Sequence, residues 1–358
     1  MAKVLLMVGT QKGAFLLTSD ERRESWSVEG PLLKGWSVFD LMLDRRQAPL
    51  MYAAVGHFIY GPAVHISDDF GQTWKQVEHV PRYESGHKLN NVWCVVPGRE
   101  SEPGVLYAGV DEAGLFVSQD SGWHWEEVSG LSGHPSREEW CPGAGGLCCH
   151  SILLDPSNDR RMWVGISAVG VFRSEDAGDS WSPSNDGLDI IIEGKTHKDV
   201  GTCVHRMILD PRNSERLFQQ NHRGVFRSTN GGQRWERIEN GIPNNFGFPM
   251  VMLPNDSNTL FVVPQESDEF RFAADGRLTV YRTTDSGDSW SPLRTGLPEN
   301  AYVGVLRQAM AADSFESPGV YFGTTGGQVY FSRDGGEDWQ AIPCALPRIS
   351  SINVAVID

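Results

Sequence analysis

The sequence predicts an all-β protein in which four-stranded sheets repeat along the whole chain. Three observations support this prediction. A short motif recurs at nearly constant spacing, the segments between its copies have the pattern of short strands, and the two chain ends carry complementary parts of one sheet. We therefore expect the 358 residues to form a single domain, residues 1–358.

The recurring motif is Ser/Thr-x-Asp-x-Gly-x-x-Trp, with Asn replacing Asp in one copy. Six copies occupy residues 67–74, 118–125, 174–181, 228–235, 283–290 and 332–339, and a degenerate seventh occupies residues 19–26. Successive tryptophans are 48 to 56 residues apart. In a turn, the Asp accepts backbone hydrogen bonds, the Gly permits a positive φ, and the Trp offers a large apolar face. A period of this length with strand-like content is typical of β-propellers.

Each repeat reads as four strands. In one repeat, residues 150–155, 162–167 and 171–174 are short apolar strands, and Trp181 opens a fourth. Residues 155–158 form a turn around Asp155-Pro156, and residues 205–235 repeat the arrangement. Four short antiparallel strands make one propeller blade, although an array of two-sheet sandwiches has a similar strand pattern.

The chain ends predict how the ring closes. Residues 3–8, 14–18 and 25–28 supply three strands of a first blade, with no innermost strand before them. Residues 351–358 resemble an innermost strand with no partner after it. Together they complete a seventh blade, so we expect a seven-bladed propeller with four-stranded antiparallel blades, closed by the N-terminal strands and the C-terminal strand.

Charge and composition exclude several classes of function. The chain has 31 Lys and Arg against 46 Asp and Glu, a formal charge of −15, which disfavours binding to a nucleic-acid backbone. The N-terminal apolar run, Val4 to Val8, is short, since a signal peptide needs roughly 7–15 apolar residues and a spanning helix about 20. We expect a cytoplasmic protein with reduced cysteines and no membrane partner.

The repeated motif resembles the Asp-box, or BNR repeat, of the sialidase-like β-propeller superfamily, and the resemblance covers the whole chain. That superfamily includes sialidases, xyloglucan-cleaving glycosidases, sorting-receptor ectodomains and photosystem II assembly factors. The resemblance implies that the Asp-boxes are structural and peripheral. It does not imply a sialidase, because the Arg-Ile-Pro segment of sialidases is absent and seven blades replace six.

Loop lengths indicate which face of the propeller carries function. Turns on one face are uniformly short, whereas the other face carries long links at residues 75–90, 127–149, 183–203 and 265–278. Function usually resides in long loops on a rigid scaffold, although such loops could also merely plug the central channel. Candidate substrate-binding residues at the channel end of this face are Asn91, Asn221, Arg307 and His57.

Three histidines predict a metal site on the same face. Cys148-x-His150 and Cys203-x-His205 occupy equivalent positions on adjacent repeats, and His222 follows on a loop beside the second. If the imidazoles of His150, His205 and His222 converge, they suit Zn²⁺ or another divalent metal. The alternatives are histidines that bind a polar ligand without metal, or hydrogen-bonded core histidines with small buried cysteines.

Candidate catalytic residues are Glu266, His222 and Glu112, because carboxylates and imidazoles can act as general acids and bases in glycoside hydrolysis. The charged loop of Glu266 could equally be a solvated surface. We expect a hydrolase or lyase of a small polar or sugar-like ligand, bound in the central funnel and possibly assisted by a metal. The alternative is a non-catalytic propeller that binds a protein partner.

Overall fold

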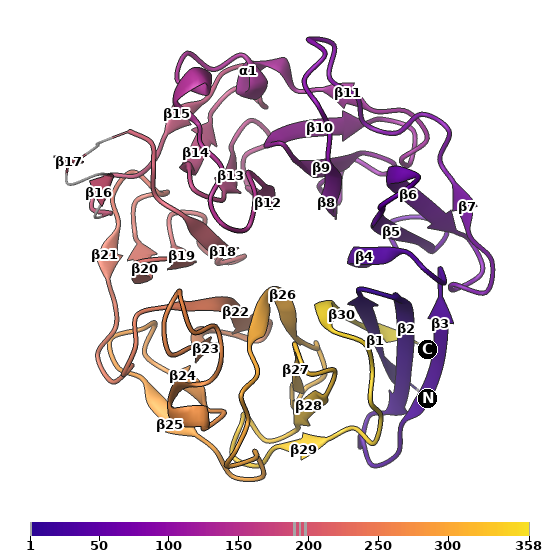
Figure 1. Ribbon diagram of the computed structural model, residues 1–358, viewed down its shortest axis with the longest axis vertical. Coiled ribbons are helices and arrows are strands. Elements are labelled where there is room, and N and C mark those ends of the chain that lie inside the picture. Colours follow the sequence, from indigo (N-terminus) through magenta and orange to yellow (C-terminus); the bar gives the residue numbers. More distant parts are fainter. Residues whose placement is uncertain (1, 189–190, 193–194, 197–198, 358) are drawn as a thin grey trace. The chain divides into compact units, whose positions relative to one another are not determined.

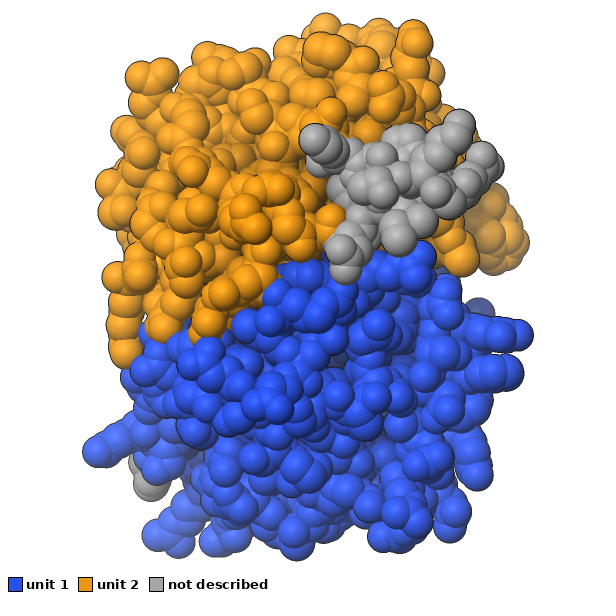
Figure 2. Space-filling model, turned by 90° about the vertical axis from the view of Figure 1, so that its left-hand side faces the viewer, with its two compact units in different colours: residues 1–41, 220–226, 237–358 blue, residues 42–219, 227–236 orange. Residues whose placement is uncertain are grey.

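The computed structural model describes residues 2–188, 191–192, 195–196 and 199–357. The chain divides into two compact units, coloured separately in Figure 2. Unit 1 comprises Met1–Leu41, Gln220–Phe226 and Arg237–Asp358, and unit 2 comprises Met42–Gln219 and Arg227–Glu236. Each unit is described by itself below.

Unit 1 contains an eight-stranded sheet, a four-stranded sheet and a short 3-10 helix, η2 (Ala274–Gly276). The eight-stranded sheet has the order β29-β28-β27-β26-β30-β1-β2-β3, and the other has the order β22-β23-β24-β25 (Figure 1). Their strands are β1 (Lys3–Thr10), β2 (Gly13–Asp20), β3 (Ser27–Leu32), β22 (Gly247–Leu253), β23 (Asp256–Pro264), β24 (Val280–Thr283), β25 (Ser291–Leu293), β26 (Val305–Ala312), β27 (Val320–Thr324), β28 (Val329–Ser332), β29 (Gln340–Ala341) and β30 (Ile349–Ile357).

Unit 2 contains the four-stranded sheets β11-β10-β9-β8 and β12-β13-β14-β15, the two-stranded sheet β16-β17 and two short helices, α1 (Ser129–Ser132) and η1 (Arg137–Glu139). Its strands are β5 (Leu50–His57), β6 (Gly61–Ser67), β7 (Lys75–Gln76), β8 (Asn91–Pro97), β9 (Leu106–Asp111), β10 (Gly114–Ser118), β11 (Glu126–Glu127), β12 (Cys149–Leu154), β13 (Met162–Ile166), β14 (Gly170–Ser174), β15 (Ser182–Pro183), β16 (Ile191–Ile192), β17 (Lys195–Thr196) and β18 (Val204–Leu209).

Two further sheets have the orders β4-β5-β6-β7 and β18-β19-β20-β21, and the unit boundary falls within each. Their remaining strands are β4 (Ser37–Asp44), β19 (Leu217–Asn221), β20 (Gly224–Ser228) and β21 (Glu236–Arg237). The protein is therefore all-β, and five of the sheets in its described residues have four strands, as the repeat predicted.

The strands predicted in the repeat of residues 150–183 are confirmed. They form the sheet β12-β13-β14-β15, in which each strand pairs with the next along the chain. All five residues of β13 are buried, because the strand lies inside the sheet and packs on both faces. A strand buried on both faces has a continuous apolar sequence, which is why Met162–Ile166 lacks polar alternation. The last strand has only two residues, so little unpaired edge is exposed.

The two chain ends pair within unit 1. Strand β30 runs antiparallel to β1, with Lys3 opposite Ile357 and Gly9 opposite Ser351. Strand β30 also meets β26 in parallel at Ser351 and Gln308, which joins the two halves of the eight-stranded sheet. The pairing predicted for the chain ends is confirmed, and the core of unit 1 packs around it, with Val4, Leu6 and Ile352 buried.

The Asp-box turns have the hydrogen bonds that their sequence predicts. In the copy at residues 174–181, Asp176 accepts the backbone N–H of Ser180 at 2.9 Å, and the hydroxyl of Ser174 accepts that of Gly178 at 2.9 Å. Hydrogen bonds from the hydroxyl and the backbone N–H of Ser180 and from the hydroxyl of Ser174 lower the pKa of Asp176 to about 2. The indole N–H of Trp181 donates to the carbonyl of Gly178 at 3.0 Å.

In the degenerate copy, Arg23 replaces the glycine and keeps a positive φ of 55°. Its guanidinium is buried and forms an ion pair with Asp313 at 2.7 Å, while its Nε donates to the Tyr321 hydroxyl, also at 2.7 Å. This turn therefore gains a buried ion pair in place of the usual glycine.

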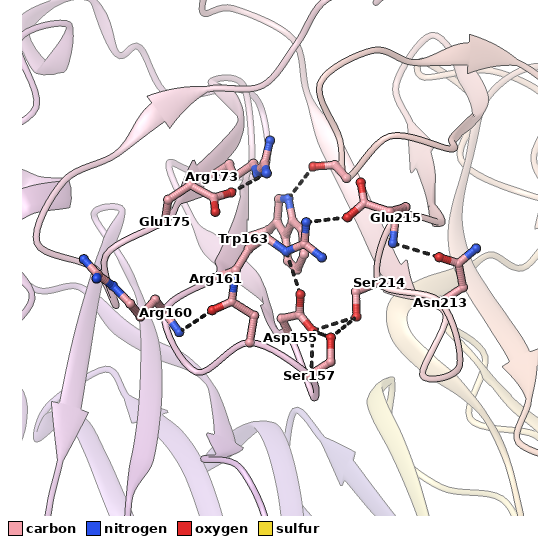
Figure 3. Close-up of polar contacts among 12 residues, drawn as sticks. Asp155, Ser157, Arg160, Arg161, Trp163, Arg173, Glu175, Asn213, Ser214 and Glu215 are labelled. Atoms are coloured by element: carbon pink, nitrogen blue, oxygen red, sulfur yellow. Dashed lines mark hydrogen bonds and ion pairs between the residues drawn. The ribbon is translucent and has the colours of Figure 1, made fainter.

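A polar network in unit 2 connects successive repeats at their Asp-Pro turns (Figure 3). The carboxylate of Asp155 is fully buried and accepts hydrogen bonds from the backbone and hydroxyl of Ser157, at 2.8 and 2.7 Å, and from the hydroxyl of Ser214, at 2.6 Å. It also forms an ion pair with Arg161 at 2.6 Å, and Arg161 reaches Glu215 beside Ser214. Asp155 thus ties its own turn to the next repeat.

Among the described residues, no helix is long and apolar enough to cross a membrane.

Candidate active site

The loop that links β23 to β24, residues 265–279, is dense in charged and aromatic side chains. Its two sides pair at Gln265 and Ala273, and Glu266 donates its backbone N–H to the carbonyl of Phe272. Residues 267–271 therefore form the tip of a hairpin-like loop. This conformation places Glu266 near the base of the loop and Asp268 and Arg271 at its tip.

A cavity of about 290 Å³ lies against the base of this loop. Its lining includes two carboxylates, two guanidinium groups, a phenol and an amide, from Glu266, Asp275, Arg277, Arg294, Tyr281 and Asn244. One carboxylate oxygen of Glu266 accepts the backbone N–H of Asp275 at 2.9 Å, which orients the acid. Tyr281 is half-buried, and burial raises the pKa of its hydroxyl against the opposing effect of Arg294. Such a polar lining with one aromatic ring suits a hydroxylated ligand.

His222 lies in the turn between β19 and β20, in a part of the chain that belongs to unit 1. Its Nε2 is 3.1 Å from a carboxylate oxygen of Asp268, and its ring meets Phe246 edge to face at 5.2 Å. Burial lowers the pKa of His222, Asp268 opposes that effect, and the charges of Arg223 and Arg271 add to it. If Nε2 carries the proton donated to Asp268, Nδ1 is the basic atom of the ring.

Among the described residues, the hydrogen bond of the Glu266 side chain is to Asp275, and the acid paired with His222 is Asp268. Asn221, the neighbour of His222, is fully buried, and its side-chain oxygen accepts the backbone N–H of Arg223 at 3.1 Å. Arg307, on β26, lies over the ring of Phe248, with 4.9 Å between its guanidinium carbon and the ring centre. Phe248 packs edge to face on Phe246, whose ring meets His222, so Arg307 and His222 border one aromatic cluster of unit 1.

In unit 2, His150 is buried and both of its ring nitrogens have partners. Nε2 is 2.9 Å from the carbonyl oxygen of Val204, and Nδ1 is 3.2 Å from the hydroxyl of Ser151. A carbonyl can only accept, so Nε2 carries a proton. A metal bound at Nε2 would have to displace this bond. His205 is buried on β18 in unit 2, whereas His222 belongs to unit 1. The zinc site expected from these three histidines stays a prediction.

The cysteines next to these histidines differ in their surroundings. Cys148 is buried, and its Sγ lies 3.5 Å from the carbonyl oxygen of Gly145. Cys149 is also buried, and burial raises the pKa of its thiol. Cys203 is half-buried just before β18. The Cys149 thiol is therefore neutral at pH 7, and both buried cysteines fill space in unit 2.

The other predicted residues of unit 2 stand at strand ends. Nδ1 of His57 accepts the backbone N–H groups of Ile59 and Tyr60, at 3.1 and 3.3 Å, so this histidine closes the turn after β5. Asn91 begins β8 and lies opposite Asp111. Glu112 directly follows β9, and its backbone carbonyl accepts a hydrogen bond from the Tyr83 hydroxyl.

Sequence reasoning missed Asp111, the residue before Glu112. Burial raises the pKa of Asp111, although hydrogen bonds from Asn91, from the backbone of Leu147 and from Asn90 oppose the rise. A carboxyl group with a raised pKa can hold a proton for general-acid catalysis. The sequence Asp111-Glu112 does not reveal which carboxyl is covered, because the covering segment around Leu147 is distant along the chain.

Comparisons with known proteins agree with the repeat. The family described as BNR/Asp-box repeat matches residues 65–76. A Paenibacillus xyloglucanase is 22% identical over 236 residues, which are 56% of this chain and 21% of that protein. An oligoxyloglucan-reducing end-specific xyloglucanase of Emericella nidulans is 28% identical over 146 residues, 39% of this chain and 16% of that protein. The chain thus spans about a fifth of the length of these relatives.

Solved structures share the fold. The GH74 enzyme of Niastella koreensis aligns with a TM-score of 0.58 at 16% identity, covering 96% of this chain and 65% of that one. YCF48 bound to D1 peptide aligns with a TM-score of 0.56 at 17% identity, covering 87% of this chain and 82% of that one. The chain therefore contains a BNR/Asp-box repeat, has a propeller-like fold, and is similar to xyloglucanases over part of its length.

Proposed function

We propose that the protein binds a saccharide and hydrolyses a glycosidic bond, using the cavity beside Glu266. The observation that carries this proposal is the cavity itself, in which two carboxylates and a tyrosine ring line one space of about 290 Å³. A carbohydrate offers hydroxyls to the carboxylates and an apolar C–H face to the aromatic ring. The sequence relationship to xyloglucanases supports the same class of ligand.

In this proposal Glu266 is the general base or acid, because its oriented carboxylate borders the cavity. The backbone bond from Asp275 fixes one oxygen and leaves the other for a water or a sugar hydroxyl. Catalytic roles for His222 and Glu112 remain proposals, and Asp111 is a further candidate acid within unit 2, because burial raises its pKa. Glycoside hydrolysis needs one carboxyl that donates a proton and one that accepts it, and the second carboxyl that lines this cavity is Asp275.

The finer architecture belongs to the same proposal. We propose that the repeats form seven blades in one ring, with β30 completing the blade of β1, β2 and β3. We also propose that His205 and His222 bind a divalent metal ion, with His150 as a further ligand. The metal content of untagged protein tests this.

A cytoplasmic location is a further proposal, and cell fractionation tests it.

The test is hydrolysis of xyloglucan oligosaccharides, measured by the reducing ends that it releases. Glu266→Gln removes the charge while keeping the shape, so activity should fall about 100-fold or more, as expected when a general acid–base group is lost. Glu269→Gln is the matched control, since Glu269 is an exposed acid of the same loop outside the cavity lining, and its activity should stay within a factor of two. Equal activity of the two variants would remove Glu266 from the proposal.

The second candidate function is binding of a protein partner without catalysis. Three consecutive side chains at the turn after β5 project into solvent, with Phe58 93%, Ile59 67% and Tyr60 72% exposed. Such an apolar tip is typical of contact surfaces between proteins. YCF48 matches over most of its length, 82% of the peptide-bound chain, which favours the same function. Absence of both saccharide binding and hydrolysis, together with a partner whose binding is lost in Phe58→Ser, would select this alternative.

A further inference from the structure

An exposed aromatic cluster lies on the 265–279 loop of unit 1 and on the segment just before β26. Phe270, at the loop tip, is 50% exposed, and Tyr302, in the segment before β26, is 68% exposed. Phe272 connects them, because its ring centre lies 6.1 Å from that of Phe270 and 5.5 Å from that of Tyr302, which it meets edge to face. The three rings therefore form one aromatic surface that solvent reaches, and such surfaces mark binding sites.

Backbone hydrogen bonds on both sides of Tyr302 fix its position against the loop. The N–H of Ala273 donates to the carbonyl of Val303 at 3.0 Å, and the N–H of Ala301 donates to the carbonyl of Gly276 at 2.7 Å. The Tyr302 ring packs on Gly276, where φ is +66° and an added Cβ would lie 2.9 Å from a ring carbon. Glycine therefore suits the position beneath the ring, and the ring is held in place before any ligand arrives.

The Tyr302 ring and the Glu266 cavity are neighbours, because both border the same short turn. Asp275, the residue before Gly276, and Arg277, the residue after it, line the cavity. Gly276 itself contacts the Tyr302 ring. An aromatic surface and a polar cavity thus lie on either side of one residue.

The size of the cavity requires further surface for a saccharide. Sites that enclose most of a drug-sized ligand measure about 300–1,000 Å³, whereas this cavity measures about 290 Å³. Part of an oligosaccharide fits inside, and its other sugar rings must lie on the surface beside the cavity. A pyranose ring combines an apolar C–H face with a rim of hydroxyls, so an aromatic ring next to polar groups matches it better than it matches the apolar face of a protein partner.

We propose that the ring of Tyr302 stacks on a second sugar ring of a saccharide whose first ring occupies the Glu266 cavity. This inference rests on the proposed binding of saccharides and adds a subsite to it. The ligand is then an oligosaccharide rather than a single sugar. Pyranose rings whose hydroxyls are all equatorial, as in β-1,4-linked glucose chains, present the flat C–H faces that pack on an aromatic ring.

The experiment compares thio-linked cellotetraose, which resists hydrolysis, with methyl 1-thio-β-glucoside by isothermal titration calorimetry on the whole chain. Wild-type protein should bind the tetrasaccharide at least about tenfold more tightly than the single sugar, as expected for one aromatic stacking contact. Tyr302→Ala should remove about tenfold of the affinity for the tetrasaccharide and leave binding of the single sugar within about twofold. Tyr302→Phe keeps the ring without the hydroxyl, so its affinity should stay within about threefold of the wild type.

The control is Trp123→Ala, which removes another exposed aromatic side chain, 41% exposed on an Asp-box turn of unit 2. It should bind the tetrasaccharide as the wild type does. Equal affinity of the wild type for the two sugars, or no binding of the tetrasaccharide, would overturn the inference. Unchanged binding in Tyr302→Ala would also overturn it, and a protein partner lost in that variant would then assign the rings to a protein contact. An equal loss in Tyr302→Phe and Tyr302→Ala would exclude stacking by the ring.

The outcome separates this inference from the proposed hydrolysis. Glu266→Gln should keep the preference for the tetrasaccharide while losing hydrolysis. If the wild type binds thio-linked cellotetraose through Tyr302 but cleaves no glycan, the hydrolase proposal fails and the inference holds. If Tyr302→Ala cleaves xyloglucan oligosaccharides with the same KM as the wild type, the inference fails and the hydrolase proposal holds.

Discussion

Replacing Asp155 with asparagine should destabilise the protein at neutral pH and remove part of its sensitivity to acid. Asp155 is fully buried, and burial by itself would raise the pKa of its carboxyl. The hydrogen bonds from Ser214 and Ser157 and the bond from Arg161 outweigh burial and bring that pKa to about 2. Asparagine has one oxygen where the carboxylate has two, and its NH₂ group would face donors that need an acceptor.

The size of the effect follows from linkage. The pKa falls from 3.8 to about 2, and each unit corresponds to about 1.4 kcal/mol, so the folded state gains about 2 kcal/mol from the ionised group. The folded pKa lies below the unfolded one. This stabilisation is therefore complete above about pH 4 and is lost as the pH falls toward 2. Asp155→Asn should lower the free energy of unfolding by at least this amount at pH 7.

The assay is urea denaturation followed by tryptophan fluorescence at pH 7, 5, 3 and 2.5. Trp163 is a suitable reporter, because Arg161 stacks on its ring, with 5.2 Å from guanidinium carbon to ring centre. The gap between wild type and variant should be widest at pH 7 and 5 and narrow below pH 4. Asp159→Asn is the control, since Asp159 is exposed in the same turn, and its effect should stay within about 0.5 kcal/mol. A gap that is absent at pH 7, or equally wide at pH 2.5, would refute the linkage argument.

Four further predictions concern stability. Burial lowers the pKa of His65 to about 4, below its unfolded value, so stability should decline as the pH falls from about 6.5 to 4 and His65→Gln should flatten that decline in urea titrations. Arg23→Ala should lower the free energy of unfolding by about 3–5 kcal/mol, because the carboxylate of Asp313 is left buried without its ion pair, and calorimetry at pH 7 measures this. Deleting residues 349–357 should abolish cooperative unfolding of unit 1, since β1 loses its partner strand; an unchanged melting curve would contradict this. Asp176→Ala should lower the melting temperature and leave activity per folded molecule unchanged, which a hydrolysis assay on the purified folded fraction decides.

Much of the fold could be predicted because each strand position is set by local pattern. Met162–Ile166 reads as a strand from its apolar run, and the pairing of β30 with β1 follows from counting strands at the two ends. The candidate site was less accessible to prediction. The partner of His222 is Asp268 and that of His150 is the carbonyl of Val204. Loop conformation and backbone position, rather than spacing in the sequence, decide both contacts.

Asp111 shows the same limit from the other side. Its carboxyl has a raised pKa because segments distant in sequence bury it. The residues next to Asp111 in the sequence do not predict this burial. The Asp-box copies were predictable for the opposite reason. Their hydrogen bonds close within four residues, as between Asp176 and Ser180, so the sequence alone contains both partners.

The pairing of β1 with β30 has a consequence for the order of synthesis. Strand β1 (Lys3–Thr10) is synthesised long before β30 (Ile349–Ile357), the strand that lies beside it in the finished sheet. Until then, one edge of β1 has unsatisfied N–H and C=O groups next to a run of apolar side chains, from Val4 to Val8. Such an edge invites wrong pairing with other chains. While the chain is still on the ribosome, unit 1 thus depends on protection of this edge, which ends when residues 349–357 emerge.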